Sequence, residues 1–158
     1  MTLTHSVRSV TRELGVEGLD QIIYGVSLGG LVAFYQMALD PEIDGLIVSQ
    51  WSEDRFEKLV DPDSRDAMWR YENGDYSILL GSALELRDRF VAQLIYPRPF
   101  GIEVGEEDPR ASSMLPLIEA LSRLYDDRPG NLHVRVNEGG HEMLYSPVVS
   151  GVWSQVQQ

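Results

Sequence analysis

Residues 22–33 read IIYGVSLGGLVA, and the predicted fold is built around this segment. Three apolar, strand-favouring residues lead into the pattern G-x-S-x-G, and an apolar segment with helical spacing follows directly. A strand, a sharp turn and a helix in this order are typical of a turn that lifts one serine hydroxyl clear of a sheet. The serine at this turn is Ser27.

Glycines surround the serine, and each has a predicted physical role. At Gly25 and Gly29 a side chain is expected to collide with the strand and the helix that flank the strained turn. Gly30 is expected to let the helix begin close to its neighbours. The helix points its amide-rich N-terminus at Ser27, where it favours a developing negative charge. The alternative interpretation is a glycine-rich turn that cradles a phosphate in some other α/β protein.

Outward from this stretch, apolar runs predict strands over residues 21–25, 45–49, 99–105 and 132–136. Helical spacing predicts helices over 3–14, from the turn to a stop before Pro41, and over 82–95, with Leu86, Phe90, Val91 and Leu94 on one side. Two more helices are expected, one with Met114, Leu117, Ile118, Leu121, Leu124 and Tyr125 on its face, and one after Ser146-Pro147 with Val149, Val152, Trp153 and Val156 inward.

Alternating strands and helices predict an α/β fold, a parallel sheet of about four strands with flanking helices. No repeat or linker divides the chain, so residues 1–158 are predicted to form a single domain.

Composition narrows the classes of function. The formal net charge of -12 argues against binding to nucleic acid or to an anionic membrane surface. No run of 18 apolar residues and no signal peptide is visible, so a cytoplasmic location is predicted. The chain has no cysteine, which excludes disulfides, thiolate catalysis and zinc–sulfur sites. His5, His133 and His141 lie too far apart in sequence to suggest a local metal site, and no cofactor is expected.

Chemistry-bearing residues follow three of the predicted strands. Ser27 follows the first strand, Asp108 the third and His141 the fourth, and in a parallel sheet such positions meet at one edge. The order Ser…Asp…His is that of an α/β-hydrolase triad. In such a triad His141 would take the proton of the serine hydroxyl, and Asp108 would fix the imidazole tautomer and stabilise the imidazolium.

Each of these positions has an alternative interpretation. Asp108 precedes Pro109 and so also fits a helix N-cap followed by proline at the first helical position. Glu106 and Glu107 are alternative candidates for the acid. His141 follows two glycines and also fits a loop histidine. His133 lies inside a strand and is expected to face the covering of the sheet.

The sequence resembles the dienelactone hydrolase and acetyl xylan esterase branch of the α/β hydrolases. The resemblance is carried by GVSLGG at 25–30, ALDP at 38–41, YPRP at 96–99, EVGEEDP at 103–109 and GGHE at 139–142. It implies hydrolysis of a small carboxylic ester without metal or organic cofactor. Ser27, Asp108 and His141 would form the triad, and Leu28 would supply a backbone N–H as oxyanion donor.

The chain also departs from that family. Family members have several strands before the helix that leads to the serine turn, and a loop among them supplies the second oxyanion donor. Only about 20 residues precede that turn here, so the resemblance implies the carboxyl-terminal half of the domain, a truncated α/β-hydrolase fold. Such a chain is expected to self-associate or to need the missing amino-terminal half, with impaired activity. The alternatives are a peptidase or acyltransferase with the same triad, or a non-catalytic interaction fragment.

Overall fold

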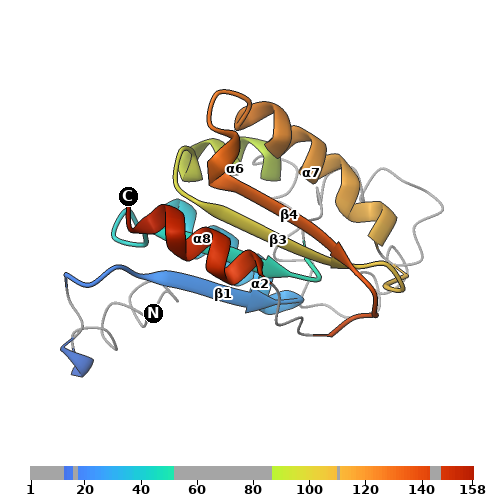
Figure 1. Ribbon diagram of the computed structural model, residues 1–158, viewed down its shortest axis with the longest axis horizontal. Helices are drawn as coiled ribbons and strands as arrows, with labels where there is room; N and C mark the ends of the chain where they lie inside the picture. The colour runs from blue at the N-terminus through green and yellow to red at the C-terminus, as the bar shows by residue number, and fades with distance from the viewer. Residues whose placement is uncertain (1–12, 16–17, 52–86, 110, 143–146) are drawn as a thin grey trace.

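The computed structural model describes residues 13–15, 18–51, 87–109, 111–142 and 147–158. Its elements follow one another in the order expected of an α/β protein, strands alternating with helices (Figure 1). In chain order they are β1 (Ile22–Val26), α2 (Leu28–Leu39), β2 (Gly45–Ser49), α6 (Asp88–Ile95), β3 (Phe100–Gly105), α7 (Ala111–Leu124), the short 3-10 helix η2 (Pro129–Asn131), β4 (Leu132–Asn137) and α8 (Val148–Val156).

The strands form one parallel sheet in the order β1-β2-β3-β4, which confirms the predicted fold class. Register is continuous across the sheet: Val26 lies opposite Ser49, and Ser49 opposite Glu103. All five residues of β2 are buried, as expected for a central strand with both faces covered. The carboxyl ends of the strands therefore share one edge of the sheet (Figure 1).

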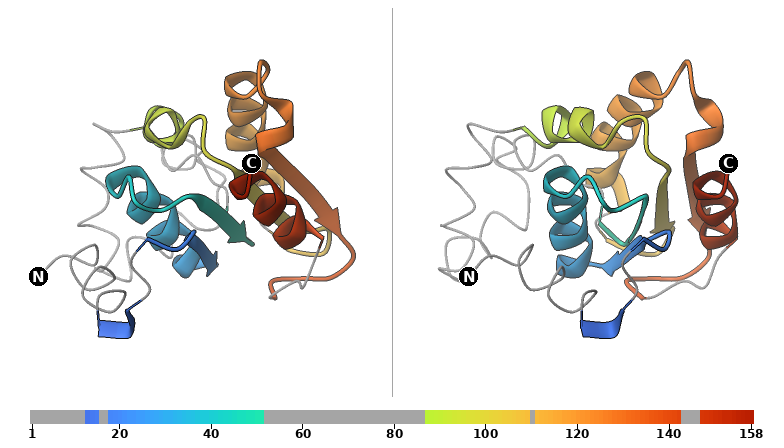
Figure 2. Two further views of the ribbon diagram at one scale, coloured as in Figure 1. Left: turned by 60° about the vertical axis from the view of Figure 1, so that its left-hand side comes forward. Right: turned by 90° about the vertical axis from the view of Figure 1, so that its left-hand side faces the viewer.

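Two layers of helices cover the sheet. Figure 2 shows α8 on one face and α2, α6 and α7 on the other. The larger core lies on the α2, α6 and α7 face, where Phe34, Phe100 and Leu117 are fully buried. The α8 face buries a smaller cluster, built around Ile47, Val148 and Val152. Because successive strand residues point to opposite faces, Ile47 packs against α8 while Leu46 and Val48 pack into the larger core.

Arg98, just before β3, is hydrogen-bonded to backbone carbonyls near the ends of α2 and α6. Its guanidinium Nη atoms donate hydrogen bonds of 2.7–3.0 Å to the carbonyl oxygens of Met37 and Asp40 near the end of α2, of Ile43, and of Leu94 in α6. The Tyr125 hydroxyl in turn donates to the carbonyl oxygen of Arg98 at 2.7 Å. Helix ends leave carbonyls without intrahelical partners, so one cation satisfies several at once.

Several predicted helices need correction. Arg87 has extended backbone, so α6 begins at Asp88 rather than near residue 82. Its inward residues are Val91, Ala92 and Ile95, whereas Phe90 and Leu94, predicted on the same face as Val91, are exposed. A helix of eight residues has few apolar positions, and the tertiary packing around it decides which of them face inward. Residues 82–86 lie outside the described residues.

The last helix is also rotated relative to the prediction. Val148 and Val152 are buried and Val156 packs against them, but Val149 and Trp153 are exposed. The face predicted for α7 is confirmed, since Met114, Leu117, Leu121 and Tyr125 are buried. The first predicted helix, 3–14, lies outside the described residues except for 13 and 14, which are helical. Among the described helices, none combines the length and the apolar character needed to cross a membrane.

Candidate active site

The three residues singled out from the sequence all follow strands at the same edge of the sheet. Ser27 comes directly after β1, Asp108 lies in the loop after β3, and His141 lies in the loop after β4. In parallel α/β sheets this carboxyl edge is where ligands bind.

Ser27 occupies a strained turn between β1 and α2. Its backbone has φ 54° and ψ -123°, a left-handed conformation that is uncommon for a residue with a side chain. Its N–H donates to the carbonyl oxygen of Ser49 at 2.9 Å, and its own carbonyl oxygen accepts from the N–H of Gly30 at 2.9 Å. Ser27 is the N-cap of α2, yet its side chain makes no capping hydrogen bond. The Ser27 hydroxyl therefore does not cap the helix that it precedes.

The glycines around Ser27 differ in how closely they are packed. A Cβ at Gly25 would overlap the backbone of Gly29, as expected for the glycine before the turn. A Cβ at Gly30 would lie 2.9 Å from the Cβ of Trp51, so the close start of the helix is also confirmed. The steric role predicted for Gly29 is wrong, because a Cβ there would have open space within 4 Å.

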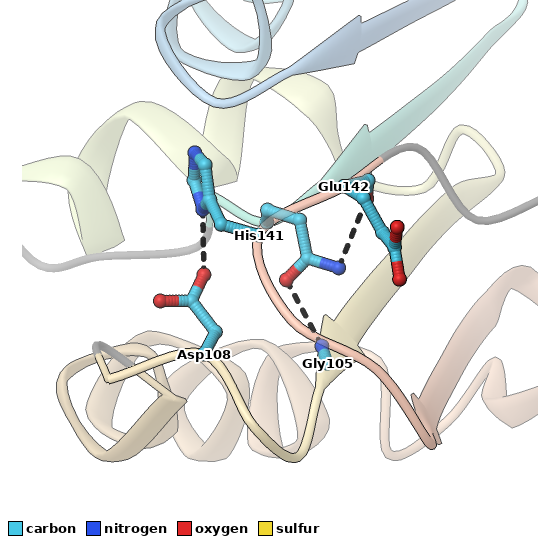
Figure 3. A network of polar contacts seen from close by, with 5 residues as sticks. Gly105, Asp108, His141 and Glu142 are labelled. Carbon is cyan, nitrogen blue, oxygen red and sulfur yellow. Dashed lines mark hydrogen bonds and ion pairs between the residues drawn. The ribbon is translucent and has the colours of Figure 1, made fainter.

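Asp108 and His141 lie against each other. Asp108 Oδ2 and His141 Nδ1 are 2.6 Å apart, and the Asp108 side chain is fully buried while that of His141 is 32% exposed (Figure 3). A buried carboxylate needs a partner to offset its lost hydration. A carboxylate only accepts hydrogen bonds, so the geometry implies a proton on Nδ1 and leaves Nε2 as the basic nitrogen of the neutral ring.

The neighbouring acids are placed differently. Glu106 and Glu107 are exposed, and their backbone N–H groups donate at 2.9 Å to the carbonyl oxygens of Asn137 and Gly139. These two bonds continue the pairing of β3 with β4 beyond the sheet. They bring the loop that carries Asp108 alongside the loop that carries His141.

Sequence interpretation missed Gln50, the residue directly after β2. Its side chain is 1% exposed; Oε1 accepts from the N–H of Gly105 at 2.9 Å, and Nε2 donates to the carbonyl oxygen of Glu142 at 3.2 Å. The only available signal was its position, since a polar residue directly after a buried strand lies at the edge where the other polar groups gather.

A complete triad would have a hydrogen bond between the serine hydroxyl and the histidine of the acid–base pair. Within the described part of the chain, no hydrogen bond links the Ser27 hydroxyl to His141. Such bonds are often long in structures without substrate. Leu28 is the first residue of α2, so its N–H has no partner within the helix and lies beside the serine.

His133 lies away from this site. It projects from β4 toward α8, where a Cβ on Gly151 would lie 2.7 Å from its Nδ1, and burial lowers its pKa. It thus faces the covering of the sheet, as predicted. Over the described ranges, no cluster of three or more His, Asp or Glu side chains is arranged to hold a metal ion.

Comparison with known proteins supports the architecture. A scan against protein-family models and a search of curated proteins gave no match. Among solved structures, the 2,6-dihydroxy-pseudo-oxynicotine hydrolase matches with a TM-score of 0.59 and 20% identity over 98% of this chain and 45% of that one. S-formylglutathione hydrolase FrmB from Staphylococcus aureus matches with a TM-score of 0.57 and 15% identity over 96% of this chain and 59% of that one.

The α/β hydrolase GrgF from Penicillium sp. sh18 matches with a TM-score of 0.54 and 15% identity, over 98% of this chain and 68% of that one. This chain thus spans 45%, 59% and 68% of the three proteins' lengths. At these identities the likeness concerns the fold. The described residues form a four-stranded parallel α/β fold that is similar to part of these hydrolases.

Proposed function

We propose that this chain is a serine hydrolase domain that acts on small carboxylic esters. The observation that carries the proposal is the 2.6 Å contact between buried Asp108 and His141, at the same sheet edge as a serine in a strained strand-to-helix turn. Strained backbone at a polar residue is a common feature of functional sites. The similar structures of two hydrolases support the same reaction class.

In this proposal each residue has a distinct role. His141 Nε2 takes the proton of the Ser27 hydroxyl as Oγ attacks the ester carbonyl carbon. Asp108 holds the imidazole in the tautomer with the Nδ1 proton and stabilises the imidazolium. The Leu28 N–H, aided by the N-terminus of α2, stabilises the negative oxygen of the tetrahedral intermediate. The alcohol leaves with the proton from His141, and water then releases the acid from Ser27.

The substrate class comes from the resemblance to the dienelactone hydrolase and acetyl xylan esterase branch. YPRP at 96–99 and EVGEEDP at 103–109 are the segments that point to this branch. A peptidase or an acyltransferase would use the same residues, so the ester preference is the finer part of the proposal.

Covalent labelling with a serine-directed fluorophosphonate tests the proposal. We expect the reagent to modify Ser27, and Ser27→Ala to abolish both labelling and turnover of a small aryl acetate. Ser122→Ala is a matched control, because the Ser122 hydroxyl lies on the exposed surface of α7 and donates to the carbonyl oxygen of Ile118. Equal labelling of Ser27→Ala and the unaltered chain would refute the proposal.

A second candidate function, a non-catalytic interaction module, is favoured by one observation. Within the described part of the chain, no hydrogen bond joins the Ser27 hydroxyl to His141. A module of this kind would bind a partner without reacting with fluorophosphonate. Absence of labelling in a folded chain would therefore favour it over the hydrolase.

A further inference from the structure

Ser49, the last residue of β2, and Gln50, the next residue, are hydrogen-bonded to the serine turn, to the strand that leads to Asp108 and to the histidine loop. The Ser49 carbonyl oxygen accepts from the N–H of Ser27 at 2.9 Å. The Gln50 N–H donates to the carbonyl oxygen of Glu103 at 2.9 Å, and the Gln50 side chain bonds the backbone at Gly105 and Glu142. The end of β2 is thus the place where the serine, aspartate and histidine loops are connected.

Gln50 is held in an unusual conformation at this place. Its φ is 57°, and among the described residues other than glycine only Ser27 also has a positive φ. A left-handed backbone is unfavourable for glutamine, so the surrounding structure must hold it there. That conformation accompanies a side chain whose two polar atoms are both hydrogen-bonded inside the protein.

Hydrogen bonds hold the backbone on both sides of His141, and the Gln50 side chain makes one of them. On the amino-terminal side, the carbonyl oxygen of Gly139 accepts from the N–H of Glu107. On the carboxyl-terminal side, the carbonyl oxygen of Glu142 accepts from Gln50 Nε2. A Cβ at Gly105 would overlap the carbonyl oxygens of Gly139 and Gly140, so the histidine loop passes directly over the residue that Gln50 Oε1 also binds.

We propose that Gln50 is a positioning residue, which holds the backbone after His141 against the strand that leads to Asp108 and so keeps the imidazole on the carboxylate. The inference rests on the proposed hydrolase function for its catalytic consequence. Both ends of the amide are needed, because only an acceptor can bind the Gly105 N–H and only a donor can bind the Glu142 carbonyl. Glutamine has both on one side chain. Because Gln50 is buried, it acts through His141 rather than on the substrate.

Two variants separate this role from general stability. Gln50→Gly removes the bridge and suits the positive φ, so its backbone is not strained. Gln50→Glu keeps an acceptor for the Gly105 N–H and, as a carboxylate, has no donor for the Glu142 carbonyl. The matched control is Gln36→Leu, since Gln36 in α2 is 3% exposed and its Nε2 has no hydrogen-bond partner within the described residues.

The first measurement is the rate of fluorophosphonate labelling as a function of reagent concentration. We expect Gln50→Gly and Gln50→Glu to lower the maximal rate about 100-fold, the size of effect that a misplaced group causes. The half-saturating concentration should stay unchanged, because Gln50 does not line the reagent's path. Gln36→Leu should label like the unaltered chain.

The second measurement does not depend on activity. Nitrogen-15 NMR of the histidines, assigned with His141→Asn, reports the tautomer of His141 and the proton on Nδ1. We expect a single Nδ1-protonated tautomer in the unaltered chain and in Gln36→Leu, and mixed tautomers in both Gln50 variants. An unchanged tautomer in a folded Gln50 variant would overturn the inference. If the unaltered chain is not labelled at Ser27, the proposed function fails, while the NMR result still decides the role of Gln50.

Discussion

The serine part and the acid–base part of the candidate site are held by different kinds of structure. Ser27 follows β1, an edge strand of the described sheet, and is placed by a left-handed backbone and one hydrogen bond to Ser49. Asp108 and His141 are 33 residues apart in sequence and are joined by a side-chain contact, by two backbone bonds between their loops and by Gln50. The serine thus depends on local steric geometry, and the acid–base pair on long-range contacts.

This difference predicts that the two parts fail in different ways. A substitution in the acid–base part should disturb protonation and chemistry while the fold survives. A substitution that crowds the serine turn should disturb the backbone, and stability should fall together with reactivity. The four predictions below are ordered from the largest expected effect to the smallest.

Asp108→Asn should have the largest effect. If the proposed triad operates, this change leaves the geometry intact but favours the wrong tautomer of His141, which lowers turnover about 10⁴-fold in serine triads. Steady-state hydrolysis of an aryl acetate measures the loss. Glu107→Gln is the matched control, because Glu107 is exposed and contributes its backbone rather than its carboxylate to the loop. A greater loss in Glu107→Gln would transfer the role to Glu107.

The addition of strands next to β1 should have the next largest effect. The similar hydrolases are longer than this chain, and the sheet order leaves β1 at an edge of the described sheet. We expect the 158-residue chain alone to self-associate through that edge, as unpaired strands do. A polypeptide with the strands that precede the serine turn in the family that the sequence resembles, added in cis or as a second chain, should supply a second oxyanion donor and raise turnover about 100- to 1,000-fold.

Light scattering coupled to size-exclusion chromatography measures the self-association, and the same samples can be assayed for turnover. The extended protein with Ser27→Ala should stay inactive, which excludes a contaminating activity. A monomeric 158-residue chain that turns over esters at about 10 s⁻¹, an ordinary enzyme rate, would contradict this prediction.

The contrast between the two parts also explains what the sequence could predict. The strands and the serine turn were predictable because apolar runs and G-x-S-x-G are local patterns. Asp108 and His141 could be singled out as candidates through chain order, since each follows a strand. Gln50 could not be found in this way, because its role depends on Gly105 and Glu142, which are 55 and 92 residues away in sequence. The inward faces of α6 and α8 were mispredicted because their packing partners, not their own apolar residues, decide their rotation.

Gly25→Ala should break the serine part without any change in charge. The added methyl group would overlap the backbone of Gly29, so strand and helix must shift. We expect a loss of about 1–3 kcal/mol in the free energy of unfolding, the usual cost of overpacking, together with slower fluorophosphonate labelling. Urea unfolding followed by circular dichroism measures the first of these effects.

Gly29→Ala is the control for this prediction. A Cβ at Gly29 has open space, and alanine favours a helix more than glycine by about 1 kcal/mol. The control should therefore be as stable as the unaltered chain, or more stable. Equal stability of Gly25→Ala and Gly29→Ala would show that the turn is not sterically constrained.

The smallest effect is expected at His133, which belongs to neither part of the site. Burial lowers its pKa below the ordinary 6.5, and its Nε2 is buried with no hydrogen-bond partner among the described residues. Below pH 6.5 the unfolded chain therefore binds a proton that the folded chain resists, so stability falls as the pH drops toward the folded-state pKa.

Other groups titrate in this range too, but they are the same in a variant that lacks the imidazole. Urea midpoints of the unaltered chain and of His133→Leu should thus keep a constant difference above pH 6.5, and below it the unaltered chain should lose stability more steeply. Parallel curves through the whole range would show that the folded protein accepts a proton on His133 as readily as the unfolded chain does.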